Sequence, residues 1–296
     1  MYRWFAAVIL LVAWSHCAVA RADKSSDSES SGGIVAQEVV ISGTKTLDSS
    51  QLSDIADSLT SVTMGDDEKE VRDRIRDKFQ QRGYFDAQVT SLKIVVLDPL
   101  AKKKPVRIQA EVEEGPLFHF AAIEFTGNKA FSSEELRKLV VLKVGDIFST
   151  GKVRSALDSL RERYVKAGYL EFVPIPNTEK SGSAQIMLSI EIDEGTQYRM
   201  GELKIGGKSD SASKLQAEWE LKTGEPYDPG YLGKYLTEHR DLLPDDFSSD
   251  RDVLWLRDCS DDTVNVTIEL DPKRPWMPMP QDKPCEPKKD PHAVRE

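Results

Sequence analysis

The stretch Ile123–Leu136, IEFTGNKAFSSEEL, occurs in three related forms and decides how this chain is organised. An earlier copy, VISGTKTLDSSQL, runs from Val40 to Leu52, and a later copy, LKIGGKSDSASKL, runs from Leu203 to Leu215. Each copy begins with alternating apolar residues, which are typical of a strand with one buried face. A glycine follows and permits a tight reversal, and residues that favour a helix start come next. The sequence therefore predicts a unit that opens as strand, turn and helix.

The unit is about as long as a small domain. Glu114 and Glu194, each followed by glycine, lie 80 residues apart. Gly83 and Gly168, each followed by tyrosine, lie 85 residues apart and come after amphipathic helical patterns. Glycine at such a position predicts a helix that ends in a left-handed residue. The period is longer than that of most solenoid repeats and indicates tandem domains.

Each copy closes with two strands, of which the last has the clearest pattern. Apolar residues occupy every second position over 106–112, 186–192 and 264–270, and the positions between them are polar except for Met187. We therefore predict an α+β chain of tandem βααββ units, three in series, each a three-stranded mixed sheet with two helices on one face. The expected boundaries are 35–117 for the first unit, 118–196 for the second and 197–272 for a degenerate third.

Both ends of the chain differ in composition from the repeats. Residues 1–20 combine Arg3, an apolar run and an Ala-x-Ala site, which predicts a cleaved secretory signal peptide. Residues 21–34 are polar and predict a disordered linker, and the proline-rich stretch 273–296 predicts an extended tail. In an exported chain, the pair Cys259 and Cys285 favours a disulfide over a redox site.

Several motifs of the second copy resemble the polypeptide-transport-associated (POTRA) domain. They are Phe125-x-Gly127-Asn128, Val144-Gly145-Asp146, Tyr164-x-x-x-Gly168-Tyr169 and Glu194-Gly195. The resemblance extends over roughly Ile34–Asp271 and is weakest in the third copy. It implies a periplasmic, non-enzymatic repeat protein like the part of BamA- and TamA-type outer-membrane assembly factors that precedes their β-barrel. No barrel strands follow here, so we expect only the binding role to carry over.

The resemblance places the middle strand of each unit at a sheet edge. Pro174 and Pro176 make this edge a poor template for another strand in the second unit, because proline has no backbone N–H to donate to a neighbouring strand. The first unit has no proline in this strand. Its alternation of apolar and polar residues is interrupted near Thr90, which predicts a bulge. Either this edge accepts an extended client segment by β-augmentation or it packs against the neighbouring unit. The candidate partner-binding residues are Val89, Thr90, Ser91, Leu92, Lys93 and Ile94.

The expected partners are unfolded or extended polypeptides, or an outer-membrane β-barrel protein. Such a protein would be periplasmic and peripheral to the outer membrane. The formal charge of -10 argues against nucleic-acid binding. No later run is apolar over the eighteen or so residues that a membrane helix needs.

No residue pattern indicates a cofactor or a catalytic centre. Gly206-Gly207-Lys208-Ser209 lacks the glycine that a P-loop requires five positions before its Gly-Lys pair, since that position is Glu202. The acidic cluster near Asp245 leaves a rival function open, a secreted metal-dependent hydrolase, and the resemblance leaves a third, a division or envelope scaffold. It lacks the ordered spacing of known calcium loops, so we predict neither metal nor catalytic residues.

Overall fold

The computed structural model describes residues 33–65, 67–207, 210–271 and 285. The expected signal peptide, nearly all of the linker and the proline-rich tail apart from Cys285 lie outside the described residues. The chain divides into two compact units. The first comprises residues up to 124 with 137–156 and 176–190, and the second comprises 125–136, 157–175 and 191 onward. The expected domain boundaries remain a prediction.

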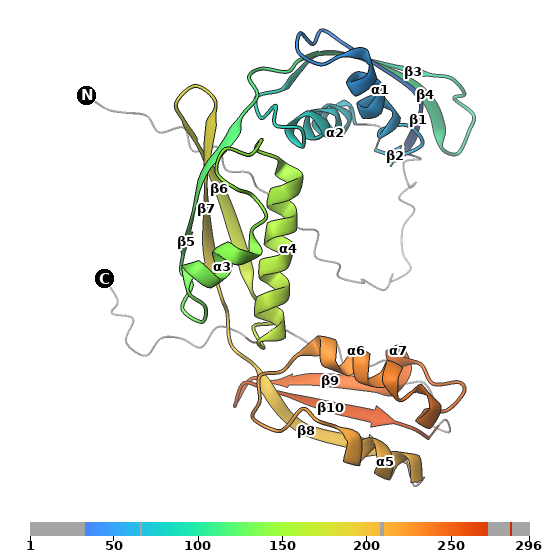
Figure 1. The fold of residues 1–296 in the computed structure, drawn as a ribbon. Helices are drawn as coiled ribbons and strands as arrows, with labels where there is room; N and C mark the ends of the chain where they lie inside the picture. The colour runs from blue at the N-terminus through green and yellow to red at the C-terminus, as the bar shows by residue number, and fades with distance from the viewer. Residues whose placement is uncertain (1–32, 66, 208–209, 272–284, 286–296) are drawn as a thin grey trace, which may run out of the picture. The chain divides into compact units, whose positions relative to one another are not determined.

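The order strand, helix, helix, strand, strand occurs three times in the described residues (Figure 1). The first segment contains β1 (Ile34–Ser42), α1 (Ser49–Asp57), β2 (Thr63–Met64), α2 (Glu68–Gln80), β3 (Gln88–Val96) and β4 (Lys104–Glu113). The second contains β5 (His119–Thr126), α3 (Ser133–Leu139), α4 (Thr150–Lys166), β6 (Val173–Ser181) and β7 (Gln185–Asp193). The third contains β8 (Arg199–Gly206), α5 (Asp210–Glu218), α6 (Pro229–Glu238), η1 (Arg240–Leu242), α7 (Ser249–Asp252), β9 (Val253–Asp258) and β10 (Thr263–Glu269).

The closing strand of each segment is central in its sheet. The strand orders are β2-β1-β4-β3, β5-β7-β6 and β8-β10-β9. In the first and third sheets the closing strand runs parallel to the opening strand and antiparallel to the middle strand. The α+β class, the mixed sheets and the edge position of the middle strands are therefore confirmed.

The first sheet has one strand more than predicted. The two residues of β2 pair antiparallel with the start of β1, with Ile34 opposite Met64. A two-residue strand is too short to produce a periodic signal, so the expectation of three strands was wrong for this segment.

The third segment is more complete than its sequence suggested. Both of its helices are present, although α6 is shorter than α2 and α4. The short helices η1 and α7 flank Pro244 in the interval before β9. Gly206 still belongs to β8, and Gly207 supplies the turn with φ +115°.

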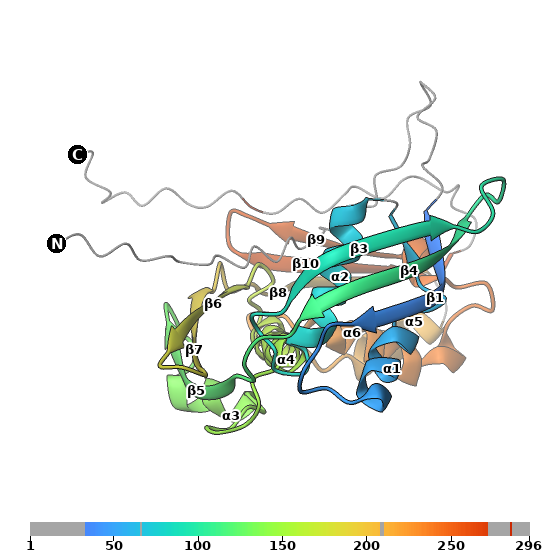
Figure 2. The same cartoon turned by 90° about the horizontal axis from the view of Figure 1, so that it is seen from above.

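The core lies between the helices and one face of each sheet. In the first segment, Val71, Ile75 and Phe79 of α2 are fully buried and belong to one apolar cluster with the inward side chains of β4. Figure 2 shows β3, β4 and β1 side by side, with α1 and α2 on one face. The opposite face of β4 is polar and exposed, which explains the alternation in its sequence. No helix in the described part of the chain combines the length and apolar character that a bilayer span needs.

Candidate functional site

The candidate edge residues all lie on β3, the outermost strand of the first sheet. The side chains of Val89, Leu92 and Ile94 are half-buried against the core. Those of Thr90, Ser91 and Lys93 are exposed. The bulge expected near Thr90 is present as a register shift between Val89 and Ser91. The side chains that face the core hold this strand in place, while its outer backbone groups have no partner strand among the described residues.

The register of β3 shows which of its backbone groups face outward. The amide of Leu97 donates to the carbonyl of Pro105 at 2.8 Å. Hydrogen-bonded pairs alternate along an antiparallel ladder, so Val95 and Lys93 bond to β4 as well. The residues between them, Leu92, Ile94 and Val96, therefore direct their N–H and C=O groups away from β4. These three residues form the open edge.

The open edge begins after the bulge. The Arg72 guanidinium donates to the carbonyl of Val89 at 2.8 Å, so that acceptor already has a partner. The hydroxyl of Thr90 donates to the carbonyl of Glu111 at 3.1 Å. The groups available for an added strand thus run from Leu92 to Val96 and overlap the candidate range 89–94 over residues 92–94; that this edge binds a partner stays a prediction. Arg72 was missed because nothing local links a helix side chain to that carbonyl.

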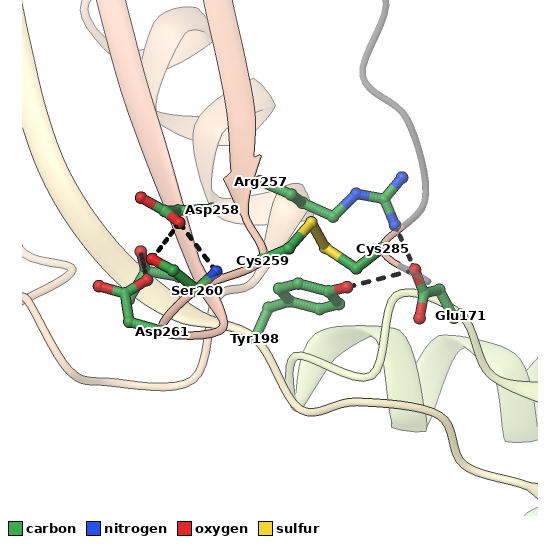
Figure 3. Close-up of a disulfide and its surroundings, with 9 residues drawn as sticks. Glu171, Tyr198, Arg257, Asp258, Cys259, Ser260, Asp261 and Cys285 are labelled. Atoms are coloured by element: carbon green, nitrogen blue, oxygen red, sulfur yellow. Dashed lines mark hydrogen bonds and ion pairs between the residues drawn. A yellow bond between two sulfur atoms is a disulfide. The ribbon is translucent and has the colours of Figure 1, made fainter. Parts of the chain in front are cut away.

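The equivalent edges of the other two sheets are less suited to pairing. Pro174 and Pro176 lie within β6, where each removes a backbone donor. β9 is only 6 residues long, and Cys259 follows it directly. Cys259 is joined in a disulfide to Cys285 (Figure 3). β3 has 9 residues and no proline, so it is the best template for an added strand among the three.

Glu114, in the first of the two repeated Glu-Gly pairs, holds a turn in place. Its side chain is only 4% exposed, and its carboxylate accepts hydrogen bonds from the amides of Lys45 and Thr46 at 2.5 and 2.8 Å. Burial alone would raise the pKa of Glu114, but these hydrogen bonds outweigh it and lower the pKa. The carboxylate thereby ties the turn after β1 to the end of β4.

Glu194 repeats this contact in the second segment. It accepts from the amides of Lys129 and Ala130 at 2.7 and 2.8 Å, and from the Tyr164 hydroxyl at 3.0 Å. Burial and the bond to Glu194 raise the pKa of Tyr164. The two glutamates of the Glu-Gly pairs found by spacing therefore hold the turn after the opening strand in the same way.

Consecutive segments meet at a joint that is built twice from matching residues. The carbonyl of Gly83 accepts the amide of Phe118 at 2.9 Å, and the carbonyl of Gly168 accepts the amide of Tyr198 at 2.8 Å. The loop after the second helix of one segment thus contacts the opening strand of the next. The left-handed conformation of both glycines, with φ +97° and +90°, aims each carbonyl at this strand.

An acid, a base and an aromatic ring complete each joint. At the first joint, Asp86 pairs with Lys180, whose ammonium lies 5.5 Å from the Phe118 ring centroid. The two charged side chains are 36% and 49% exposed, so water screens this ion pair. The acid follows glycine by three residues in both copies, and this spacing could have revealed it.

The second joint has the same parts with more burial. Glu171 pairs with Arg257 at 2.8 Å, and Arg257 lies 5.6 Å from the Tyr198 ring centroid (Figure 3). Arg257 is only 10% exposed and Glu171 25%. The Tyr198 hydroxyl also donates to Glu171 at 3.2 Å. Burial, and then the charge of Glu171, raise the pKa of Tyr198.

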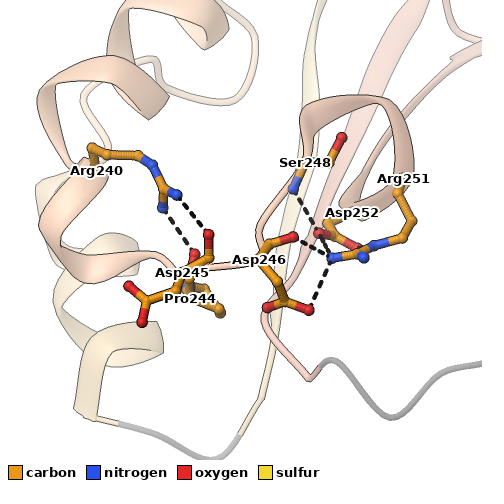
Figure 4. Close-up of polar contacts among 7 residues, drawn as sticks. All are labelled: Arg240, Pro244, Asp245, Asp246, Ser248, Arg251 and Asp252. Carbon is orange, nitrogen blue, oxygen red and sulfur yellow. Dashed lines mark hydrogen bonds and ion pairs between the residues drawn. The ribbon is translucent and has the colours of Figure 1, made fainter.

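The acidic cluster near Asp245 is interleaved with arginine (Figure 4). Arg251 contacts Asp252 at 2.6 Å and Asp246 at 3.6 Å, and it lowers the pKa of Asp252. Arg240 donates to the carbonyl of Asp245 at 3.1 Å. Within the described residues, no group of three or more His, Cys, Asp and Glu side chains is arranged to hold a metal ion. Nothing in this arrangement supports the hydrolase alternative.

Comparison with known proteins agrees with the fold. Residues 118–195 match the model of the POTRA family, described as surface antigen variable number repeat. A putative outer membrane protein assembly factor of Treponema pallidum is 26% identical over 234 residues, which cover 68% of this chain and 28% of that protein. The outer membrane protein assembly factor BamA of Neisseria meningitidis is 24% identical over 166 residues, which cover 54% of this chain and 20% of that protein.

A solved structure shows the same fold. The crystal structure of POTRA domains 3–5 of BamA from Haemophilus influenzae superimposes with a TM-score of 0.53 at 19% identity, covering 81% of this chain and 96% of that one. The chain spans only a quarter or so of the two curated relatives' length. Residues 118–195 are therefore a POTRA domain, and the chain that contains them is related to the BamA-type outer membrane protein assembly factors.

Proposed function

We propose that this chain is a non-enzymatic periplasmic module that binds polypeptides during outer-membrane protein assembly or transport. The open edge of β3, from Leu92 to Val96, accepts an extended segment of a client or of a partner barrel protein by β-augmentation. The observation that carries the proposal is the run of outward-facing backbone groups on a strand without proline at the end of its sheet. The kinship with assembly factors makes polypeptides the most fitting ligand class.

The edge is suited to clients of varied sequence. Leu92, Ile94 and Val96 each offer one donor and one acceptor, so an added strand gains up to about six backbone hydrogen bonds. Each contributes roughly 1 kcal/mol net, which gives useful but reversible affinity. Because main-chain groups make these contacts, side-chain identity affects binding only weakly.

Fluorescence anisotropy with a synthetic strand tests the proposal. The probe is a labelled short peptide of alternating valine and threonine, and its control carries N-methyl groups on alternate amides. Methylation removes the ladder donors on one side and leaves the side chains unchanged. We expect the plain peptide to bind and the methylated peptide to bind much more weakly. Equal affinity, or no binding because the edge packs against a neighbouring unit, would contradict the proposal.

A calorimetric titration with calcium, zinc and manganese tests the rival hydrolase. The binding module predicts no stoichiometric heat with any of the three ions. The pairing of Arg251 with Asp246 and Asp252 is the physical reason, because a metal would have to displace the guanidinium from both carboxylates.

A further inference from the structure

The loop that joins β3 to β4, residues 97–103, exposes apolar side chains. Leu100 is 94% exposed and Leu97, at the start of the loop, is 43% exposed; Val96, the last residue of β3, is 44% exposed. The amide of Leu100 donates to the Asp98 carboxylate at 2.9 Å, which holds the turn with Leu100 directed outward. Figure 2 shows this loop projecting past the ends of the neighbouring strands. A leucine held this far into water costs free energy unless a partner covers it.

The same loop is basic in an otherwise acidic chain. Lys102, Lys103 and Lys104 follow Leu100 closely, and Asp98 is the only acidic residue between 97 and 105. The chain as a whole carries a formal charge of -10. Lys103 contacts the hydroxyl of Thr63 at 3.4 Å. None of the three lysines forms an ion pair with another described residue, so the positive charge of the loop is available to a partner.

From this combination we infer that the tip of the β3–β4 loop docks on the surface of an anionic lipid bilayer. Leu100 and Leu97 enter the boundary between headgroups and acyl chains, and the lysines remain among the headgroup phosphates. Lysine stems are long enough to lie along apolar surface while their ammonium groups stay in the polar layer. Apolar area and cationic charge act together in such interfacial binding.

A bilayer suits the shape of the tip better than a folded partner. Leu100 projects from a convex turn, so a protein partner would need a matching pocket, whereas a lipid surface adapts to a projecting side chain. The overall negative charge repels an anionic bilayer from the rest of the molecule. The basic tip is therefore the part that turns toward such a surface. This inference does not depend on strand addition at β3, because the loop lies beyond the last paired residue of the strand.

Vesicle sedimentation tests the inference. The full chain, purified after natural processing of its N-terminus, is spun with vesicles of phosphatidylcholine alone or mixed with phosphatidylglycerol in equal parts. We expect binding to the anionic vesicles only, weakening as salt is added. Lys102→Glu with Lys103→Glu should lower the partition coefficient roughly tenfold or more, because each cationic residue near the surface contributes about fivefold. Leu100→Ser should lower it severalfold.

Two variants with matched changes elsewhere serve as controls. Lys129→Glu with Lys143→Glu changes the net charge equally, and Val144→Ser removes another well-exposed apolar side chain, 72% exposed in the wild type. Both should bind vesicles as the wild type does. If the tip variants bind as well as these controls, the inference is wrong. Binding of the wild type to polyglutamate, but not to anionic vesicles, would also overturn it and would indicate an acidic polypeptide as the partner.

Discussion

Replacing Ile94 with proline separates binding at the β3 edge from the stability of the sheet. The amide of Ile94 points away from β4, so proline removes a donor that only an added strand would use. The pyrrolidine ring also occupies the space where that strand would lie. The loss of one backbone hydrogen bond, about 1 kcal/mol, together with this obstruction should raise the Kd for the valine–threonine peptide about tenfold.

The expected cost to the fold is small. The Ile94 side chain is half-buried against the core, and exchanging it for proline removes little more than a methylene of buried surface. That corresponds to roughly 1 kcal/mol of unfolding free energy. Lys93→Pro is the matched control. Lys93 is exposed, but its amide belongs to the β3–β4 ladder opposite Gln109. Its loss leaves a carbonyl without its donor and costs about 1–3 kcal/mol.

The assay pairs peptide anisotropy with urea unfolding for Ile94→Pro, Lys93→Pro and Ile94→Val. We expect Ile94→Pro to lose affinity with a minor change in stability, and Lys93→Pro to lose mainly stability. Ile94→Val keeps the amide and should bind normally. If Ile94→Pro binds the peptide as tightly as Ile94→Val does, the edge is not the binding site and the assignment of outward-facing amides is refuted.

The remaining predictions concern the contacts that hold the segments together. Glu114→Gln should lower stability at neutral pH by about 1–3 kcal/mol, measured by urea unfolding, because it weakens charge-assisted bonds to buried amides. The lowered pKa of Glu114 means that its carboxylate stabilises the fold above about pH 4.3 and that this contribution is lost on further acidification, so the variant and the wild type should converge at acidic pH. Arg257→Met should cost about 2 kcal/mol by leaving a partly buried carboxylate without its cation, whereas Lys180→Met at the exposed joint should cost less than about 1 kcal/mol; equal costs would contradict the burial argument. Replacing Cys259 and Cys285 by serine should reduce stability by roughly 3 kcal/mol, seen as faster hydrogen exchange in β9 and β10, since the disulfide closes a loop across a separation of 26 residues.

Patterns that act over a few neighbouring residues were sufficient for most of the fold. The alternation over 106–112 and 264–270 identified the closing strands, because a strand buried on one face must alternate, and their central place in the sheet followed from the resemblance. The residues that favour a helix start do so in the first copy, where Asp48 and Gln51 form a capping box at the start of α1. The bulge near Thr90 followed from a slip in apolar phase.

Features that depend on contacts between distant residues could not be predicted from the sequence. Alternation fixes which side chains of β3 face the core, but it does not determine whether those same residues direct their amides toward β4 or away from it. The candidate range 89–94 therefore overlaps the open edge over residues 92–94. The ion pair between Asp86 and Lys180 joins residues 94 positions apart, and no local pattern indicates that separation.

The twofold occurrence of the joint has an evolutionary consequence. The second segment carries both complementary halves of it, with Phe118 and Lys180 on the side facing its predecessor and Gly168 and Glu171 on the side facing its successor. A tandem duplication of the gene fragment that encodes this segment would place the Gly168 and Glu171 of one copy against the Phe118 and Lys180 of the next copy. The array can therefore lengthen by whole modules without inventing a new surface, whereas a duplication broken mid-module would leave one half without its counterpart.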